Sequence, residues 1–274
     1  MLANLKTMLL RPVENTAPEA ADAIIFSQKK LARSVGIIAF FMPWVLYFGA
    51  MTGPFCTQSS ISHYYFLPFW GSIFVALMGF IGIFMLSYRG HNRWDRLMAR
   101  FGGVMALIVA IFPTSGRGCG SKTDYVARIF QRVGLPPEDE NALFDAFHYE
   151  VMGLRFTSQD IHVAAAALLF LILTWFALIS FRRDNGEGVS HMDGQSVASE
   201  RKHRRNRIYL ICGSVMLAAI AILAVYPDTS NGVKSPLPAV FLLEAIALMS
   251  FGLSWSIKGR LLPWLNDVLD KPLS

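Results

Sequence analysis

Long apolar stretches, separated by shorter polar segments rich in Lys and Arg, dominate the sequence. The longest of them, residues 34–88, contains no Lys, Arg, Asp or Glu. About 20 apolar residues are enough to cross the hydrocarbon core of a bilayer, so this stretch must contain two crossings and a turn. Backbone N–H and C=O groups cannot remain unpaired in lipid, which predicts helices. The pattern therefore predicts an all-α, polytopic membrane helical bundle with six transmembrane helices, at residues 34–51, 66–88, 101–116, 161–181, 208–227 and 237–257.

The composition agrees with lipid as the solvent of the chain. Only 16% of the 274 residues are charged, whereas soluble domains have about a quarter. A net charge of +6 and a pI of about 9.3 would also suit a nucleic-acid-binding protein. A membrane protein acquires the same excess from its cytoplasmic loops, so we expect membrane lipids as partners and no nucleic acid.

The positions of the basic residues predict the orientation. Lys and Arg gather in the segment before the first predicted span, in the loops after the second and fourth spans, and in the tail. Because Lys and Arg are enriched in cytoplasmic loops, both termini are predicted to be cytoplasmic in a multi-pass protein of the bacterial inner membrane. The basic cluster 200–207, ERKHRRNR, then indicates a stop-transfer segment that meets anionic head groups.

The spans divide the chain into three predicted parts. These are an amphipathic cytoplasmic segment 1–33, the transmembrane domain 34–257 and a cytoplasmic tail 258–274. The domain carries an extracytoplasmic lid loop, 117–160, and a cytoplasmic basic loop, 182–207. Within the first part, residues 17–33 are amphipathic and are expected to form a helix that lies along the cytoplasmic interface, separate from the first span.

Both loops have patterns of their own. In the lid loop, helical spacing of apolar residues predicts helices at 122–133 and 138–154. In the basic loop, residues 184–199 are polar and rich in Gly and Ser, which predicts a flexible linker.

Three cysteines occur, and the predicted topology separates them. Cys212 lies inside the fifth span and is interpreted as a small buried apolar residue. Cys56 and Cys119 both fall on the extracytoplasmic side, where disulfides form in bacteria. Either they form a disulfide between the first two outer loops or they are two independent thiols.

Three ionisable residues mark a candidate catalytic site in the outer half of the membrane. Glu244 is the one carboxylate inside a predicted span, about 10 Å from its outer end at 1.5 Å per residue. An ionisable side chain in the membrane is costly and indicates a functional or a paired interior residue. His63 lies just before the second span and His162 begins the fourth. We predict that Glu244 is the functional centre and faces one of these histidines.

The chemistry of this set has several readings. Two histidines and a glutamate suit general acid–base catalysis and are also a common zinc set, although no ligand spacing supports a metal here. Ser59, Ser60 and Ser62 could supply a nucleophile near His63, but no glycine-flanked serine accompanies them. The structural reading is that the histidines sit at the interface and that Glu244 binds a neighbouring helix. The metal and any other cofactor are unknown from sequence.

Asp160 is interpreted as a structural residue and not as a catalytic one, because it follows Thr157 by three residues. This spacing predicts a capping box at the start of the fourth span.

Three short motifs, in this order, resemble bacterial six-helix membrane proteins that are distant relatives of the Frag/DRAM/Sfk-type family. They are SISHYYF before the second span, GGVMALIVAIFPT ending the third, and the His162-initiated IHVAAAALLF of the fourth. The resemblance covers about residues 35–257, although those relatives typically carry Asp at the position of His63. It implies a helical bundle and, from some eukaryotic members, a link to lipid remodelling.

These observations give one leading hypothesis and two alternatives. The leading hypothesis is a lipid-associated protein with a polar site in the outer half of the membrane, and a lipid-modifying enzyme is one form of it. The first alternative is a small-solute or proton-coupled transporter that titrates Glu244. The second is a non-catalytic membrane scaffold or sensor. The nearly apolar cytoplasmic halves of the spans count against transport, because a transporter needs a polar path from both sides.

Overall fold

Six long helices make up most of the chain that the structure, a computed structural model, describes. The helices are α2 (Pro18–Met51), α3 (Pro68–Ser87), α4 (Arg93–Ile111), α5 (Ser158–Leu178), α6 (Glu200–Val225) and α7 (Ala239–Lys258). The described residues are 18–53, 57–90, 92–112, 114, 148–151, 154–183, 189–192, 195–198, 200–225 and 239–266.

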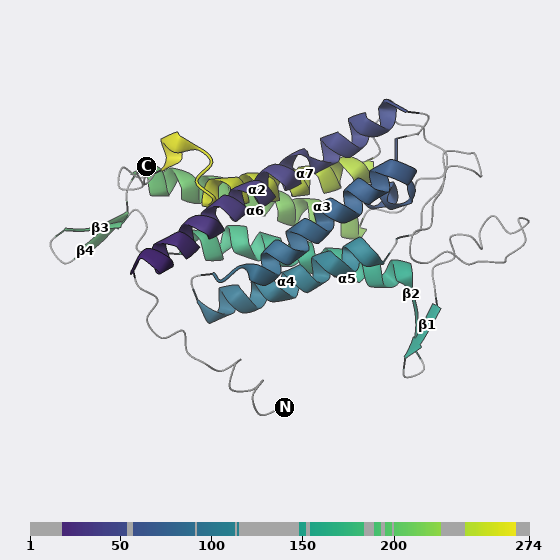
Figure 1. Ribbon diagram of the computed structural model, residues 1–274, viewed down its shortest axis with the longest axis horizontal. Coiled ribbons are helices and arrows are strands. Elements are labelled where there is room, and N and C mark those ends of the chain that lie inside the picture. Colours follow the sequence, from purple (N-terminus) through teal and green to yellow (C-terminus); the bar gives the residue numbers. More distant parts are fainter. Residues whose placement is uncertain are drawn as a thin grey trace, which may run out of the picture.

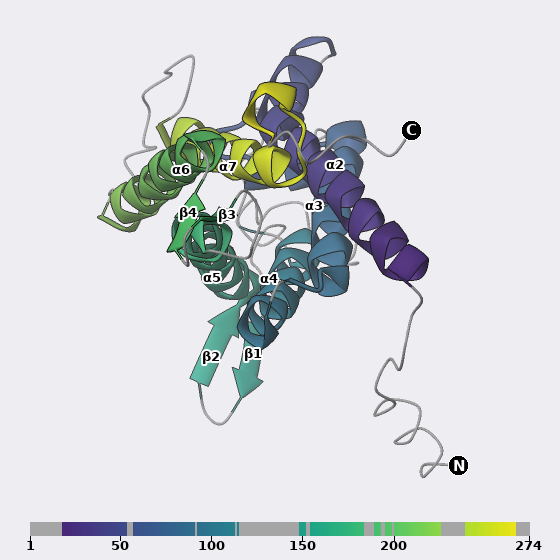
Figure 2. The same ribbon diagram turned by 90° about the vertical axis from the view of Figure 1, so that its left-hand side faces the viewer.

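The helices form a closed ring in sequence order. Each packs against the next along the chain, and α7 packs against α2 to close the ring. Figure 2, which looks along the bundle, shows this arrangement. Successive helices run in opposite directions (Figure 1). Every second connection along the chain therefore lies at the same end of the bundle. The all-α helical bundle predicted from the sequence is therefore confirmed.

The two ends of the bundle differ in character. One end, called here the basic end, holds the start of α2, α4 and α6, residues 88–90, residues 179–183 and the end of α7. The opposite end, called the site end, holds residues 57–67, the end of α4, and the start of α5 and α7. The segments that the sequence predicts to be cytoplasmic thus meet at one end.

Within the described chain, five helices are long and apolar enough to cross a membrane: α2, α3, α5, α6 and α7. The exception is α4, which corresponds to the short third stretch predicted at 101–116. It begins earlier than predicted, at Arg93, because Asn92 caps it by accepting a hydrogen bond from the N–H of Asp95 at 2.8 Å. It ends at Ile111, as expected for a helix that precedes Pro113.

Two helices extend beyond their predicted starts toward the basic end. The separate interfacial helix expected within 1–33 was wrong, because residues 18–33 continue into the first span as the single helix α2. Helix α6 begins at Glu200, so the basic cluster 200–207 is helical and does not belong to a loop. In both cases no Pro or Gly interrupts the helix before the predicted span.

Two short antiparallel hairpins replace other predicted loop structures. Strands β1 (His148–Val151) and β2 (Leu154–Thr157) pair where the sequence predicted the end of a helix at 138–154. That part of the lid prediction was wrong, since residues 148–151 pair with residues 154–157 as strands. Likewise, β3 (Val189–Met192) and β4 (Gln195–Ala198) pair within the predicted linker 184–199. The predicted helix 122–133 lies outside the described residues.

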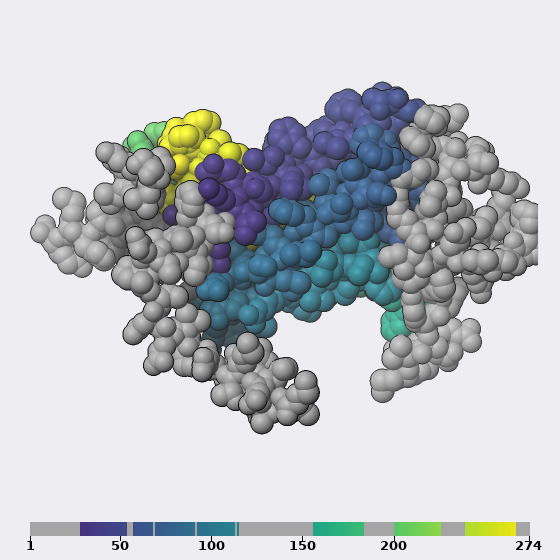
Figure 3. All heavy atoms as spheres, in the orientation of Figure 1, coloured from purple at the N-terminus to yellow at the C-terminus, as the bar shows by residue number. Residues whose placement is uncertain are grey.

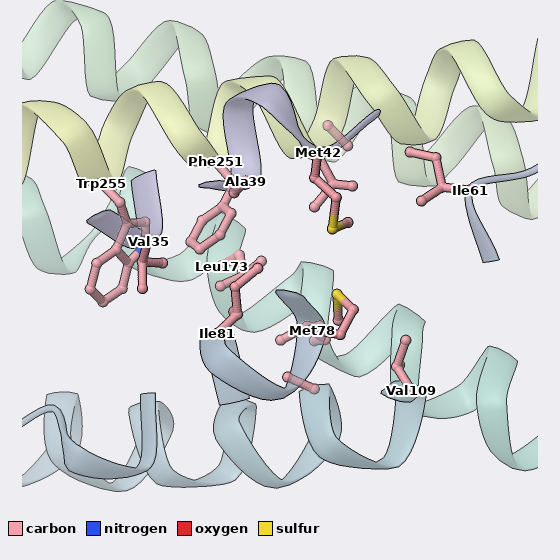
Figure 4. Packing of buried hydrophobic residues seen from close by; sticks show 14 of the residues in the cluster. Val35, Ala39, Met42, Ile61, Met78, Ile81, Val109, Leu173, Phe251 and Trp255 are labelled. Atoms are coloured by element: carbon pink, nitrogen blue, oxygen red, sulfur yellow. The ribbon is translucent and has the colours of Figure 1, made fainter. Parts of the chain in front are cut away.

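The core lies between the helices and is almost wholly apolar. Figure 4 shows side chains from α2, α3, α4, α5 and α7 that meet there. Trp255 of α7 is fully buried and its ring centroid lies 5.1 Å from those of Phe84 and Tyr88. Cys212 of α6 is also buried, which confirms its predicted role as a packing residue. Cys56 and Cys119 lie outside the described residues, so their disulfide stays a prediction.

Helices α2 and α7 approach each other through glycine. A Cβ atom on Gly252 would lie 2.5 Å from the backbone nitrogen of Phe40 and 2.6 Å from the carbonyl oxygen of Gly36. Small residues allow such close approach, which is the main source of packing energy between helices in lipid.

The outer surface of the ring is apolar, as a lipid-facing surface should be. Figure 3 shows one such face, formed by α2, α3, α4 and α5 lying side by side. Large apolar side chains on these helices are exposed, among them Phe48, Ile83, Val104 and Leu171. This distribution reverses that of a soluble bundle and supports a membrane protein.

Candidate functional site

Glu244 contacts the segment that precedes α3. Its carboxylate accepts a hydrogen bond from the backbone N–H of Ile61 at 2.6 Å. The hydroxyl of Ser60 lies 2.9 Å from each carboxylate oxygen and donates to the carboxylate. Ile61 immediately precedes the 3₁₀ helix η1 (Ser62–Phe66), so Glu244 places a carboxylate at the start of that helix.

Further contacts fix residues 59–63, called here the serine segment, to the bundle. The N–H of Phe241, in the first turn of α7, donates to the carbonyl oxygen of Ser59 at 3.0 Å. This bond uses a helix N-terminal donor that has no partner within its own helix. The N–H of Ser62 donates to the hydroxyl oxygen of Ser60 at 3.2 Å, so the segment is tied both to α7 and within itself.

His162 contacts the same segment from α5. Its Nε2 lies 2.9 Å from the hydroxyl oxygen of Ser62, and its Nδ1 lies 2.7 Å from the carbonyl oxygen of Phe112. A carbonyl oxygen can only accept, so Nδ1 carries the proton in the neutral ring. Nε2 is then the acceptor of the Ser62 hydroxyl proton. With 3% of its surface exposed, His162 is held in this orientation by both neighbours.

The local sequence explains the position of His162. Thr157 and Asp160 form the predicted capping box: the Thr157 N–H donates to Asp160 at 2.8 Å, and the Asp160 N–H donates to the Thr157 hydroxyl at 3.1 Å. The box starts α5 at Ser158 and so places His162 in its second turn, facing the end of α4. The predicted role of Asp160 is confirmed.

His63 pairs with a different serine. Its Nδ1 lies 3.0 Å from the Ser59 hydroxyl oxygen, across four positions of the chain. From the sequence alone, any of the three serines could lie near His63, whereas in the structure Ser60 contacts Glu244 and Ser62 contacts His162. Glu244, His162 and His63 therefore each contact the serine segment, and each contacts a different serine.

A buried tyrosine contacts the residue that precedes the serine segment. The backbone N–H of Gln58 donates to the phenol oxygen of Tyr64 at 3.5 Å. Burial raises the pKa of Tyr64 to about 12, although the bond from Gln58 acts in the opposite direction. The phenol therefore keeps its proton at neutral pH.

The zinc reading of the three residues finds no support in the described part of the chain. There, no group of three His, Cys, Asp or Glu side chains is close enough to hold a metal ion. The geometry instead favours proton transfer, because both ring nitrogens of His162 are occupied by a hydroxyl and a carbonyl.

Sequence reasoning missed the pairing that defines the site. The run SSISH signals a polar cluster, but it does not show which serine meets which partner. The carbonyl of Phe112 carries no side-chain signal at all. Contacts of this kind depend on how α4, α5 and α7 end beside one another.

Comparisons with known proteins assign no role to these residues. In comparisons with protein families, curated proteins and solved structures, the chain matches none of them.

Proposed function

We propose that this protein is a membrane-embedded enzyme that cleaves or transfers an acyl group of an ester lipid. Ser62 is the nucleophile, His162 is the general base and the carbonyl of Phe112 orients the imidazole. The observation that carries the proposal is the Ser62–His162–Phe112 chain, with 2.9 Å from hydroxyl to Nε2 and 2.7 Å from Nδ1 to the carbonyl. This arrangement of nucleophile, base and orienting group is how serine hydroxyls are activated.

The reaction follows from these positions. The Ser62 oxygen bonds to the ester carbonyl carbon while its proton moves to Nε2 of His162. The ester C–O bond then breaks, and the alcohol leaves with that proton. Water or a second alcohol attacks the acyl-serine and, by the same route in reverse, regenerates Ser62. A neutral carbonyl stabilises the imidazolium less than a carboxylate would, so we expect a slow enzyme.

A lipid substrate is supported by the surroundings of the site. The serine segment leads through η1 into the apolar helix α3. Ser62 is partly exposed, while its partner His162 is buried. The outer faces of the helices are apolar, so a lipid in the bilayer is the ester that meets this end of the bundle. The proposed resemblance to the Frag/DRAM/Sfk-type family also favours a lipid substrate, because some eukaryotic members of that family are linked to lipid remodelling.

The proposed setting is a bacterial inner membrane with the basic end in the cytoplasm. This orientation rests on the enrichment of Lys and Arg in cytoplasmic segments, which here meet at one end of the bundle. The serine segment then lies in the outer half of the membrane, and the substrate comes from the outer leaflet.

Glu244 and His63 have supporting roles in this proposal. Glu244 is a positioning residue, because it holds Ser60 and Ile61 and thereby the register of Ser62. His63 bonds Ser59 and lies beside the nucleophile in the chain. The transporter alternative is less well supported, since the large buried side chains that follow Glu244 along α7, among them Leu248, Phe251 and Trp255, are apolar, and the buried polar ones are only Ser254 and Ser256.

A fluorophosphonate probe tests the proposal, because it reacts covalently with activated serines. Membranes that contain the full-length protein are treated with the probe, and the labelled residue is identified by peptide mass spectrometry. We expect labelling at Ser62, its loss in Ser62→Ala, and its retention in Ser59→Ala, the matched control in the same segment. No labelling of the folded wild-type protein, or labelling at Ser59, would contradict the assignment.

A further inference from the structure

A small cavity opens at the basic end, far along the bundle from the serine segment. It lies between residue 183, the first turns of α6 and the end of α7. The cavity measures about 20 Å³, counted as space for the centres of water-sized molecules. One water needs about 10–15 Å³ by this measure, so the cavity holds a group larger than one water but no large ligand.

The cavity is lined by cations. Arg183, Lys202, Arg205, Lys258 and Arg260 all contribute to its wall. The other described residues that line it are neutral, and no carboxylate is among them. Arg183 also donates to Asp95, which lies outside the lining, at 3.3 Å. Guanidinium and ammonium groups gathered in one wall are donors that suit an anion.

Two of the cations are buried, unlike ordinary basic residues of a membrane surface. Lys202 is 4% exposed and Arg205 is 6% exposed, whereas Arg204 and Arg207 of the same helix are exposed. Basic residues that only mark the cytoplasmic side of a membrane have no need of burial. Arg205 is also fixed in place, because its Nη1 donates to the carbonyl oxygen of Leu265 at 2.6 Å.

A third cation occupies a position that normally belongs to glycine. After α7, the N–H of Leu261 donates to the carbonyl of Ser256 at 2.9 Å and the N–H of Arg260 to that of Ile257 at 3.0 Å. These two bonds form a Schellman motif, in which the residue with positive φ is usually glycine. Here it is Arg260, with φ of 61°. A backbone strain kept at this position points to a use for the side chain.

The strained turn is held from α2. Arg33 donates to the carbonyl oxygen of Arg260 at 3.1 Å and to that of Gly259 at 3.4 Å. The wall of the cavity thus comes from α6, from the end of α7 and from the residues after α5, and α2 holds the turn at Arg260 in place.

We propose that this cavity binds a phosphate-bearing anion, either the head group of an anionic phospholipid or free phosphate. Arg and Lys N–H groups are the usual donors to phosphate oxygens, and basic pockets between helices on the cytoplasmic side take anionic head groups. The site is separate from the serine segment and does not depend on the acyl-transfer proposal.

The test measures thermal unfolding of the purified, delipidated full-length protein in a neutral detergent. Short-chain phosphatidylglycerol, short-chain phosphatidylcholine and inorganic phosphate are titrated in separate arms. We expect phosphatidylglycerol or phosphate to raise the unfolding temperature and phosphatidylcholine to have little effect. Stabilisation by phosphatidylglycerol alone assigns a lipid head group, and equal stabilisation by phosphate assigns the free anion. Both results support the site, whereas stabilisation by neither overturns it.

Variants locate the effect. Arg260→Gly and Lys202→Gln should weaken binding about tenfold, the loss expected for one charge-assisted contact. Arg207→Gln removes the same charge from the exposed face of α6 and should leave binding within about twofold. Arg260→Gly should unfold at no lower temperature than the wild type without ligand, because glycine accepts positive φ freely. The site is therefore testable even if Lys202→Gln does not fold. Unchanged binding by Arg260→Gly would overturn the proposal.

Discussion

The carboxylate of Glu244 accepts a hydrogen bond of 2.6 Å from the backbone N–H of Ile61, a residue 183 positions earlier in the chain. The only intramembrane glutamate of the predicted spans thus contacts backbone and hydroxyl donors at the start of a 3₁₀ helix. Because of this contact, substitutions can test whether Glu244 positions the serine segment or transfers a proton.

Glu244→Gln and Glu244→Leu should differ. Gln keeps one acceptor for the Ile61 N–H, so we expect a folded protein with reduced probe labelling at Ser62. Leu leaves the Ile61 N–H and the Ser60 hydroxyl without this acceptor and should cost about 1–3 kcal/mol of stability. Thermal unfolding in detergent and labelling of both variants check this. Abolished labelling in a fully stable Glu244→Gln protein would instead indicate a chemical role for the carboxylate.

His162 and His63 can be separated by substitution. His162→Ala removes the base proposed for Ser62, so labelling should slow by about 10²–10⁴-fold, the usual contribution of a general base. His63→Ala is the matched control, since His63 bonds Ser59, and labelling should change only severalfold. Labelling rates in membranes measure both. A larger loss in His63→Ala than in His162→Ala would move the base to His63.

The α2–α7 contact should not tolerate a side chain at Gly252. A Cβ there would come within 2.6 Å of two backbone atoms, which cannot move aside cheaply. We expect Gly252→Ala to lower the free energy of unfolding by about 1–3 kcal/mol, as overpacking does. Gly79→Ala is the control, because nothing lies within 4 Å of its Cβ position, and it should be neutral or stabilising by up to about 1 kcal/mol. Equal effects of both substitutions would rule out the close contact.

The orientation can be tested with single cysteines placed at Gly186 and Asn141. A membrane-impermeant maleimide should label the Asn141 position in intact cells and the Gly186 position only after the inner face is exposed. This follows from the Lys and Arg distribution. The reverse pattern would place the serine segment in the inner half of the membrane.

The predicted disulfide between Cys56 and Cys119 is checked by mass spectrometry without reduction. If the bond forms, the two peptides are recovered linked while Cys212, which is buried and free, is not. Recovery of both peptides as free thiols in protein from an oxidising compartment would favour two independent cysteines.

The sequence by itself determined that six apolar segments of the described chain form helices, and in which order. Five of them are long and apolar enough to cross a membrane with their backbone groups paired inside the helix, so lipid as the solvent favours a helix there. The capping box of Thr157 and Asp160 was equally readable, because its two bonds join residues three positions apart. Local features of this kind need no knowledge of the rest of the fold.

Only the tertiary structure decided which residues meet. Ser62 joins His162 across 100 positions, and Ser60 joins Glu244 across 184. Such contacts depend on how far each helix extends and on how the helix ends align, and a one-dimensional pattern contains neither. The basic cluster 200–207 shows the same limit. Its charges are evident in the sequence, but the burial of Lys202 and Arg205 follows from the early start of α6 and its packing against the end of α7.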